Sequence, residues 1–262
     1  MSINLSKEET INKINLNKEE VHNIRLSKKS LINQTIYGVL ALDFSGSMNK
    51  LYKDGTVQSV IEKALPIAME FDDDGEMEVW LFDDSYHRLP NISLKNVYDY
   101  VNREILNKYH MGGTCYAPVM KDIFNQYKKK TSGGLFRKAG PKYPEYVLFI
   151  TDGDNSDKGN TNAIIKEVSK YPIFWQFIGI GNASFNYLRK LDDMTDRYVD
   201  NADFFAVNTI DNITYDKLFD EFPSYLTNEK VIKMYSNIWG SFMLKSDKEI
   251  MKECEEMDSF YY

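Results

Sequence analysis

The sequence has few of the side chains that build zinc sites, disulfide frameworks and catalytic triads. Its 262 residues include two cysteines, Cys115 and Cys254, and three histidines. The cysteines are far apart in the chain, and no CxxC pair or Cys/His cluster occurs, which excludes the usual zinc and disulfide patterns. Uninterrupted apolar runs stay well below the roughly 20 residues that a membrane span needs.

The start of the chain lacks the features of a targeting segment. The stretch MSINLSKEETINKINLNKEE contains no basic part followed by an apolar part, so no signal peptide is predicted. We therefore expect a cytoplasmic protein that does not bind or span a membrane. Basic charge is scarce too, because 32 Lys and Arg against 39 Asp and Glu give a net charge of −7. Nucleic acid is not an expected partner of such a chain, whereas a cation is compatible with it.

Motifs for nucleotide binding and nucleophilic hydrolysis are also missing. The stretches GIGNAS and SGGLFRKAG match neither GxxxxGKS/T nor GxGxxG. A serine nucleophile would need a histidine base, and the chain offers only His22, His87 and His110. His110 lies near Thr114 in the sequence and could approach a site there, but a satisfied surface or loop histidine is the preferred interpretation.

What the sequence does contain is an alternation of short apolar runs and helical patterns. The expected strands are 36–42, 77–83, 146–150, 173–181 and 204–208. The expected helices are 57–71, 94–106, 117–130, 161–171, 185–194 and one or two within 214–235. Strands that are apolar throughout are typical of a parallel sheet covered on both faces. We therefore predict an α/β fold, a Rossmann-like three-layer αβα arrangement, for residues 35–235.

Residues 1–34 form an N-terminal extension with a repeated phrase. It reads INLSKEE at 3–9, INLNKEE at 14–20 and IRLSKKS at 24–30. The apolar-polar-apolar alternation favours short strands, whereas Ser or Asn before Lys-Glu-Glu can also begin a helix. Two interpretations stay open, a flexible polar leader and an extension that docks on the main domain or on a partner. Residues 236–262 are treated as a C-terminal tail.

The first expected strand ends in the sequence ALDFSGSM, which carries three oxygen-bearing side chains at alternate positions. These are Asp43, Ser45 and Ser47, with Gly46 giving the backbone freedom for a tight turn. Hard oxygen ligands of low total charge suit Mg²⁺, Mn²⁺ or Ca²⁺. A Ser- and Asp-rich loop is also typical of a turn followed by a helix cap, so the motif alone leaves both interpretations open.

Two further positions support the metal interpretation. Thr114 follows two glycines just before a predicted helix, and Asp152 follows the strongest apolar strand. A helix-cap residue and an ordinary turn would explain each one separately. However, ligands of parallel sheets bind beyond the carboxyl ends of the strands. The five residues together therefore predict a cluster of oxygen ligands at one edge of the sheet.

Asp43-x-Ser45-x-Ser47, then Thr114, then Asp152, in these strand contexts, resembles the von Willebrand factor type A (vWA) domain with its metal-ion-dependent adhesion site. The resemblance covers roughly residues 35 to 235 and implies a mostly parallel sheet with one antiparallel edge strand. It also implies that the five residues bind one divalent cation, with Mg²⁺ the first expectation and Mn²⁺ or Ca²⁺ the alternatives. A carboxylate from a protein partner would complete the shell of the cation.

A finer similarity links the chain to the vWA proteins of bacterial tellurium-resistance and chemical-stress systems. It rests on VLALDFSGSM, LFITDGDNSD, FWQFIGIG and the repeated leader, which resembles the opening strands of the stress-protein domains in those systems. The resemblance thus implies a non-enzymatic, metal-dependent protein-binding module in a cytoplasmic stress complex. A metal-assisted hydrolase or phosphatase at the same ion, and a metal sensor or buffer without a partner, stay as alternatives. The oligomeric state is not predicted.

The loop after Asp152 contains three more polar residues, Asp154, Asn155 and Asp157. They could add a second cation contact, but the simpler expectation is that they are solvated loop residues.

Overall fold

The computed structural model describes residues 5–28, 31–32, 34–132, 140 and 143–220. Within them a six-stranded sheet has the strand order β3-β2-β1-β4-β5-β6. The strands are β1 (Tyr37–Asp43), β2 (Met77–Phe82), β3 (Tyr86–Ile92), β4 (Glu145–Thr151), β5 (Ile173–Ile180) and β6 (Ala202–Val207). All neighbouring pairs are parallel except β2 and β3. The predicted mostly parallel sheet with one antiparallel edge strand is confirmed.

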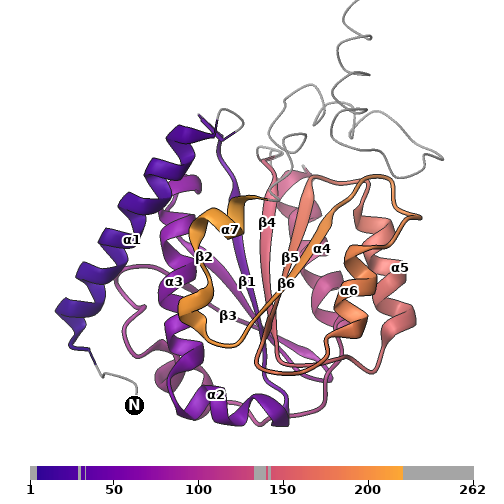
Figure 1. Ribbon diagram of the computed structural model, residues 1–262, viewed down its shortest axis with the longest axis horizontal. Coiled ribbons are helices and arrows are strands. Elements are labelled where there is room, and N and C mark those ends of the chain that lie inside the picture. The colour runs from indigo at the N-terminus through magenta and orange to yellow at the C-terminus, as the bar shows by residue number, and fades with distance from the viewer. Residues whose placement is uncertain (1–4, 29–30, 33, 133–139, 141–142, 221–262) are drawn as a thin grey trace, which may run out of the picture.

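Helices cover both faces of the sheet (Figure 1). The described helices are α1 (Lys7–Ser27), α2 (Asn49–Lys53), α3 (Thr56–Phe71), α4 (Ala117–Thr131), α5 (Lys158–Val168), α6 (Asn186–Asp192) and α7 (Tyr215–Asp220). Two short 3₁₀ turns, η1 (Gly46–Met48) and η3 (Ile210–Asn212), and a π-helical segment, η2 (Val101–Leu106), complete the set. In Figure 1, α3 lies on one side of the sheet and α4, α5 and α6 lie on the other, which confirms the three-layer arrangement.

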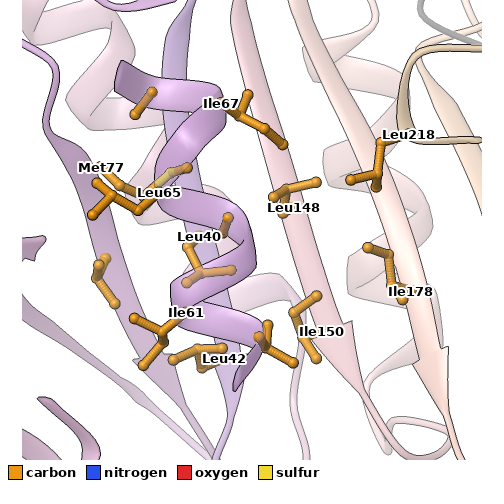
Figure 2. Packing of buried hydrophobic residues seen from close by; sticks show 14 of the residues in the cluster. Leu40, Leu42, Ile61, Leu65, Ile67, Met77, Leu148, Ile150, Ile178 and Leu218 are labelled. Carbon is orange, nitrogen blue, oxygen red and sulfur yellow. The ribbon is translucent and has the colours of Figure 1, made fainter. Parts of the chain in front are cut away.

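Each central strand is buried on both faces because its side chains alternate between two cores. In β1, Leu40 and Leu42 belong to the core under α3, whereas Val39 and Ala41 belong to the core under α4, α5 and α6. Figure 2 shows the first of these cores, in which Leu40 and Leu42 lie beneath α3. The apolar runs of the sequence therefore predicted these central strands correctly.

The leader forms one long helix, α1, so the strand interpretation of the repeats is wrong for Lys7–Ser27. Its start has a capping box, in which the Glu9 N–H donates to Ser6 Oγ at 3.2 Å and the Ser6 N–H donates to Glu9 Oε2 at 2.7 Å. The buried residues of α1 are Thr10, Ile14, Val21 and Ile24. Their spacing of four, seven and three residues gives one helical stripe.

The extension docks on its own main domain, since α1 packs against α3 on the side away from the sheet (Figure 1). Arg25 holds the C-terminal end of α1 against the main domain. Its guanidinium donates to Glu70 Oε1 at 3.1 Å and to the Gln34 carbonyl at 2.8 Å, and it lies 4.9 Å from the centre of the Phe71 ring. The alternative of a flexible leader is thus excluded for the described part of the extension.

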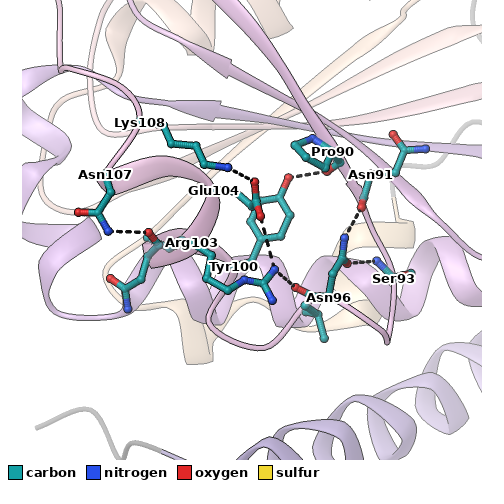
Figure 3. A network of polar contacts seen from close by, with 12 residues as sticks. Pro90, Asn91, Ser93, Asn96, Tyr100, Arg103, Glu104, Asn107 and Lys108 are labelled. Carbon is teal, nitrogen blue, oxygen red and sulfur yellow. Dashed lines mark hydrogen bonds and ion pairs between the residues drawn. The ribbon is translucent and has the colours of Figure 1, made fainter.

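The segment between β2 and α4 departs most from the sequence-based expectation. Strand β3 was not located, because YHRLPNI is mostly polar and contains a proline, which is tolerated at a sheet edge. The helix predicted for 94–106 is confined to Val101–Leu106, and Asp99 before it has a positive φ of 55°. Polar contacts replace the missing turns, as Figure 3 shows. The Tyr100 hydroxyl donates to the Pro90 carbonyl, and Lys108 pairs with Glu104.

The strand order reverses at β1, since the chain moves from β1 to β2 on one side and later returns to β4 on the other. Ligand sites of such sheets lie at this switch point, beyond the carboxyl ends of the strands. Asp43 ends β1 and Asp152 follows β4, so both flank the switch point.

No helix within the described ranges combines the length and the apolar character of a membrane span. The predicted tail 236–262, and the part of the predicted 214–235 helices beyond Asp220, lie outside the described residues.

Candidate metal centre

Asp43 is the last residue of β1, and its side chain is fully buried at the carboxyl edge of the sheet. Its Oδ1 accepts a hydrogen bond from the Ser45 N–H at 2.7 Å, and its Oδ2 accepts one from the Thr151 hydroxyl at 2.6 Å. The Asp43 carbonyl oxygen accepts a further hydrogen bond from the buried Tyr52 hydroxyl at 2.8 Å. The carboxylate and the backbone carbonyl of Asp43 are therefore both held by hydrogen bonds.

The hydroxyls of Ser45 and Ser47 extend this polar group toward solvent. Their Oγ atoms are 3.0 Å apart, and Ser47 Oγ donates to Asp152 Oδ1 at 2.8 Å. Ser45 is buried, Ser47 is exposed and Asp152 is half-buried. Four of the five predicted site residues thus form one connected group, which consists of Asp43, Ser45, Ser47 and Asp152.

Burial dominates the electrostatics of this group. It raises the pKa of the Asp43 carboxyl to about 6, against the lowering effect of the hydrogen bonds from Thr151 and Ser45, and the nearby Asp152 charge adds to the rise. Burial also raises the pKa of Asp152, while the hydrogen bond from Ser47 lowers it. Two carboxylates therefore lie close together in a site that favours an added positive charge.

Thr114 lies on a neighbouring loop, and in the described chain no hydrogen bond joins its hydroxyl to the other four residues. The loop that carries Thr114 is nevertheless bonded to the loop that carries Ser45 and Ser47. Gly112 pairs with Ser45 in a parallel bridge, and the Gly46 N–H donates to the Gly112 carbonyl at 3.2 Å. The structure therefore places Thr114 beside the connected group but not within it.

The Thr114 loop is fixed by two acidic residues that the sequence analysis did not select. The Gly113 N–H donates to Asp84 Oδ2 at 2.8 Å, and the Cys115 N–H donates to the Asp83 carbonyl at 2.8 Å. A Cβ atom on Gly113 would collide with Asp84 Oδ1, so a larger residue here would force the Asp84 carboxylate to move. Asp83 and Asp84 directly follow β2, and their place at a strand end was the signal that could have identified them.

Two of the polar residues after Asp152 stabilise the start of α4. Asp157 accepts hydrogen bonds from the Tyr116 and Ala117 N–H groups, at 2.9 and 2.8 Å, where α4 begins. The buried Asn155 side chain donates to Asp157 Oδ1 at 2.6 Å, whereas Asp154 is exposed. The expectation of a solvated loop is thus correct for Asp154 and wrong for Asn155 and Asp157.

The donor set fits a hard divalent cation. Its side-chain donors are all oxygens, from carboxylates and hydroxyls, which Mg²⁺, Mn²⁺ and Ca²⁺ prefer. Within the described chain neither Asp43 nor Asp152 forms an ion pair, so their charge lacks a counter-charge. No three His, Cys, Asp or Glu side chains of the described residues gather into a metal-binding group. A cation at this edge would therefore depend on the hydroxyls of Ser45, Ser47 and Thr114.

The histidines do not supply a base to either serine in the described chain. Ser45 and Ser47 bond each other and Asp152, whereas His110 is exposed without a hydrogen bond to them. The His22 side chain bonds Glu70 of α3, and the His87 ring packs on Tyr109.

Comparison with known proteins identifies the class. The family model described as "vWA found in TerF C terminus" matches residues 35–234. The chain therefore belongs to the vWA family, in its TerF-like group. The uncharacterized protein YcbR of Bacillus subtilis is 41% identical over 224 residues, which are 83% of this chain and 88% of that protein.

The chain is also similar, at low sequence identity, to solved structures. The Plasmodium vivax TRAP protein, solved with manganese, is 16% identical with a TM-score of 0.46 over 66% of this chain and 68% of that one. Proximal thread matrix protein 1 of the mussel byssus, solved with a zinc-occupied MIDAS motif, is 14% identical with a TM-score of 0.41. This match covers 77% of the present chain but only 46% of the mussel protein, so the chain spans less than half of that protein's length.

Proposed function

We propose that the chain is a divalent-cation-dependent protein-binding module that is not itself an enzyme. In this proposal one cation is held by Asp43, Ser45, Ser47, Thr114 and Asp152. The observation that carries the proposal is the connected group of hydroxyls and carboxylates at the topological switch point, in which two aspartates lack a counter-charge.

The ligand chemistry favours Mg²⁺, with Mn²⁺ and Ca²⁺ as alternatives, because the neutral hydroxyls suit hard cations that keep part of their shell open. The group is buried at Asp43 and exposed at Ser47, so a cation bound here is reachable from solvent. An aspartate or glutamate of a protein partner is the expected additional ligand, since an anionic oxygen bonds strongly to an electrophilic ion.

The proposed setting is a cytoplasmic bacterial complex of tellurite resistance or chemical stress response. Membership in the TerF-like group is compatible with this setting, and the similarity to the Bacillus subtilis protein supports a bacterial one. A basic patch for nucleic acid is not part of the proposal, because the chain carries a net charge of −7.

Calorimetric titration of metal-stripped protein with Mg²⁺, Mn²⁺ and Ca²⁺ tests the metal site. Asp152→Asn removes one carboxylate charge while leaving an oxygen for Ser47, so it should abolish saturable binding near one ion per chain. Asp154→Asn is the matched control, since the same substitution two residues away lies on an exposed side chain outside the connected group. Asp43→Ala is less suitable, because the Thr151 hydroxyl and the Ser45 N–H would lose their buried acceptor.

The outcomes separate the alternatives. Binding that survives unchanged in Asp152→Asn would contradict the proposed site. Turnover of phosphate esters that is lost in Asp152→Asn would favour a metal-assisted hydrolase. Metal binding without affinity for any carboxylate-bearing peptide would favour a sensor or buffer.

A further inference from the structure

We propose that the groove beside the candidate metal centre binds a second acidic side chain of the partner. The preferred ligand is then an extended acidic polypeptide segment in which one carboxylate binds the cation and another, two residues away, lies near two lysines. This inference rests on the proposed function, because the first carboxylate is the one that completes the metal shell.

The groove adjoins the connected group at Ser47 and has a volume of about 560 Å³. It runs along η1 and α2, and its lining residues are Gly46, Ser47, Asn49, Lys50, Lys53 and Asp54. Because Ser47 bonds Asp152, a ligand atom that reaches the cation lies at one end of this groove.

Both lysines line the same groove as Ser47. Ser47, Lys50 and Lys53 follow one another at intervals of three residues in the consecutive helical turns η1 and α2. Residues three apart on a helix are neighbours on one face. With a rise of 1.5 Å per residue, the lysine backbones lie about 5 and 9 Å along the segment from Ser47.

The charges of the groove suit an anion. Lys50 and Lys53 are exposed, and neither forms an ion pair with another described residue. The one acid among the lining residues, Asp54, accepts hydrogen bonds from the Thr56 N–H at 3.1 Å and the Thr56 hydroxyl at 2.7 Å. Two lysines against one aspartate still leave the lining of the groove with an excess of one positive charge, in a chain of net charge −7.

An extended peptide matches this layout. Extended chain advances about 3.3 Å per residue. Its side chains alternate between two faces, so an acid two residues from the metal-binding acid lies on the same face, about 7 Å away and between the positions of Lys50 and Lys53. Exposed ion pairs are weak, so the expected preference for two acids over one is about threefold to tenfold.

Two fluorescein-labelled peptides test the inference with the full chain at saturating Mn²⁺, by fluorescence anisotropy. One peptide has an aspartate and, two residues later, a glutamate, and the other has glutamine in place of the glutamate. The wild type should prefer the first peptide about threefold to tenfold, and the double variant Lys50→Ala/Lys53→Ala should bind both equally. Lys158→Ala is the control, since Lys158 at the same sheet edge already pairs with Asp154 at 2.8 Å.

The metal titration keeps the two ideas distinguishable. The double lysine variant should bind Mn²⁺ as the wild type does, and higher salt should reduce the peptide preference because the lysines are exposed. Equal affinity of the wild type for both peptides, with metal binding intact, would overturn the groove inference and leave the metal site standing. Loss of the preference in Lys158→Ala would also overturn it, since general charge would then be the cause. Absence of Mn²⁺ binding in the wild type would overturn the proposed function itself.

Discussion

The docking of α1 on α3 predicts very different effects on stability for substitutions at two residues of one leader repeat. In the phrase INL at 14–16, Ile14 is fully buried, whereas Leu16 is 66% exposed. Ile14→Ala removes a buried side chain and leaves a cavity, which costs about 2 to 5 kcal/mol. Leu16→Ala removes an exposed side chain from the same helix and should change stability by less than about 0.5 kcal/mol.

Urea unfolding followed by circular dichroism measures the two free energies, and native-state hydrogen exchange of the α1 amides resolves local opening. If α1 unfolds together with the domain, Ile14→Ala lowers the global free energy of unfolding. If α1 opens separately, the loss is confined to the α1 amides. Equal effects of Ile14→Ala and Leu16→Ala in both measurements would refute the docked helix.

Two glycines and one aspartate give the remaining predictions. Gly113→Ala should weaken metal binding about tenfold or more by displacing Asp84, whereas Gly153→Ala, with open space at its Cβ position, should leave it unchanged in the same titration. Burial raises the pKa of Asp192 from 3.8 to about 7, with Asp203 adding to the rise, so the fold loses stability as the pH rises through this interval and the loss is complete above it. Asp192→Asn should therefore raise stability more at pH 8 than at pH 5 in urea unfolding, and an equal gain at both would contradict the shift.

The sequence predicted most of the sheet, because strands buried on both faces are apolar throughout, as in β1 and β4. The sequence also predicted that Asp43 and Asp152 lie at one edge of the sheet, because parallel strands end on the same side. Strand β3 could not be predicted from the sequence, because its polar residues and Pro90 do not form a strand pattern. The helix α1 could have been found, because the spacing of Thr10, Ile14, Val21 and Ile24 already gives a helical stripe.

The supporting residues of the site could not be predicted in the same way. Asp84 fixes the Gly113 backbone 29 residues away, and Asp157 caps α4 across 41 residues. Such contacts depend on how two loops lie against each other, and no local pattern encodes that placement.

Paramagnetic broadening by Mn²⁺ tests the central claim most directly, because it shows where the cation binds. In ¹H–¹⁵N spectra of the full chain, a small amount of Mn²⁺ should first broaden the amide signals of Ser45, Ser47 and Gly153. Signals at the other end of the strands, such as Glu145, lie about 20 Å away along β4 and should broaden last. Broadening centred away from Ser45 and Ser47, or the same pattern in Asp152→Asn, would contradict a metal centre at the end of β1.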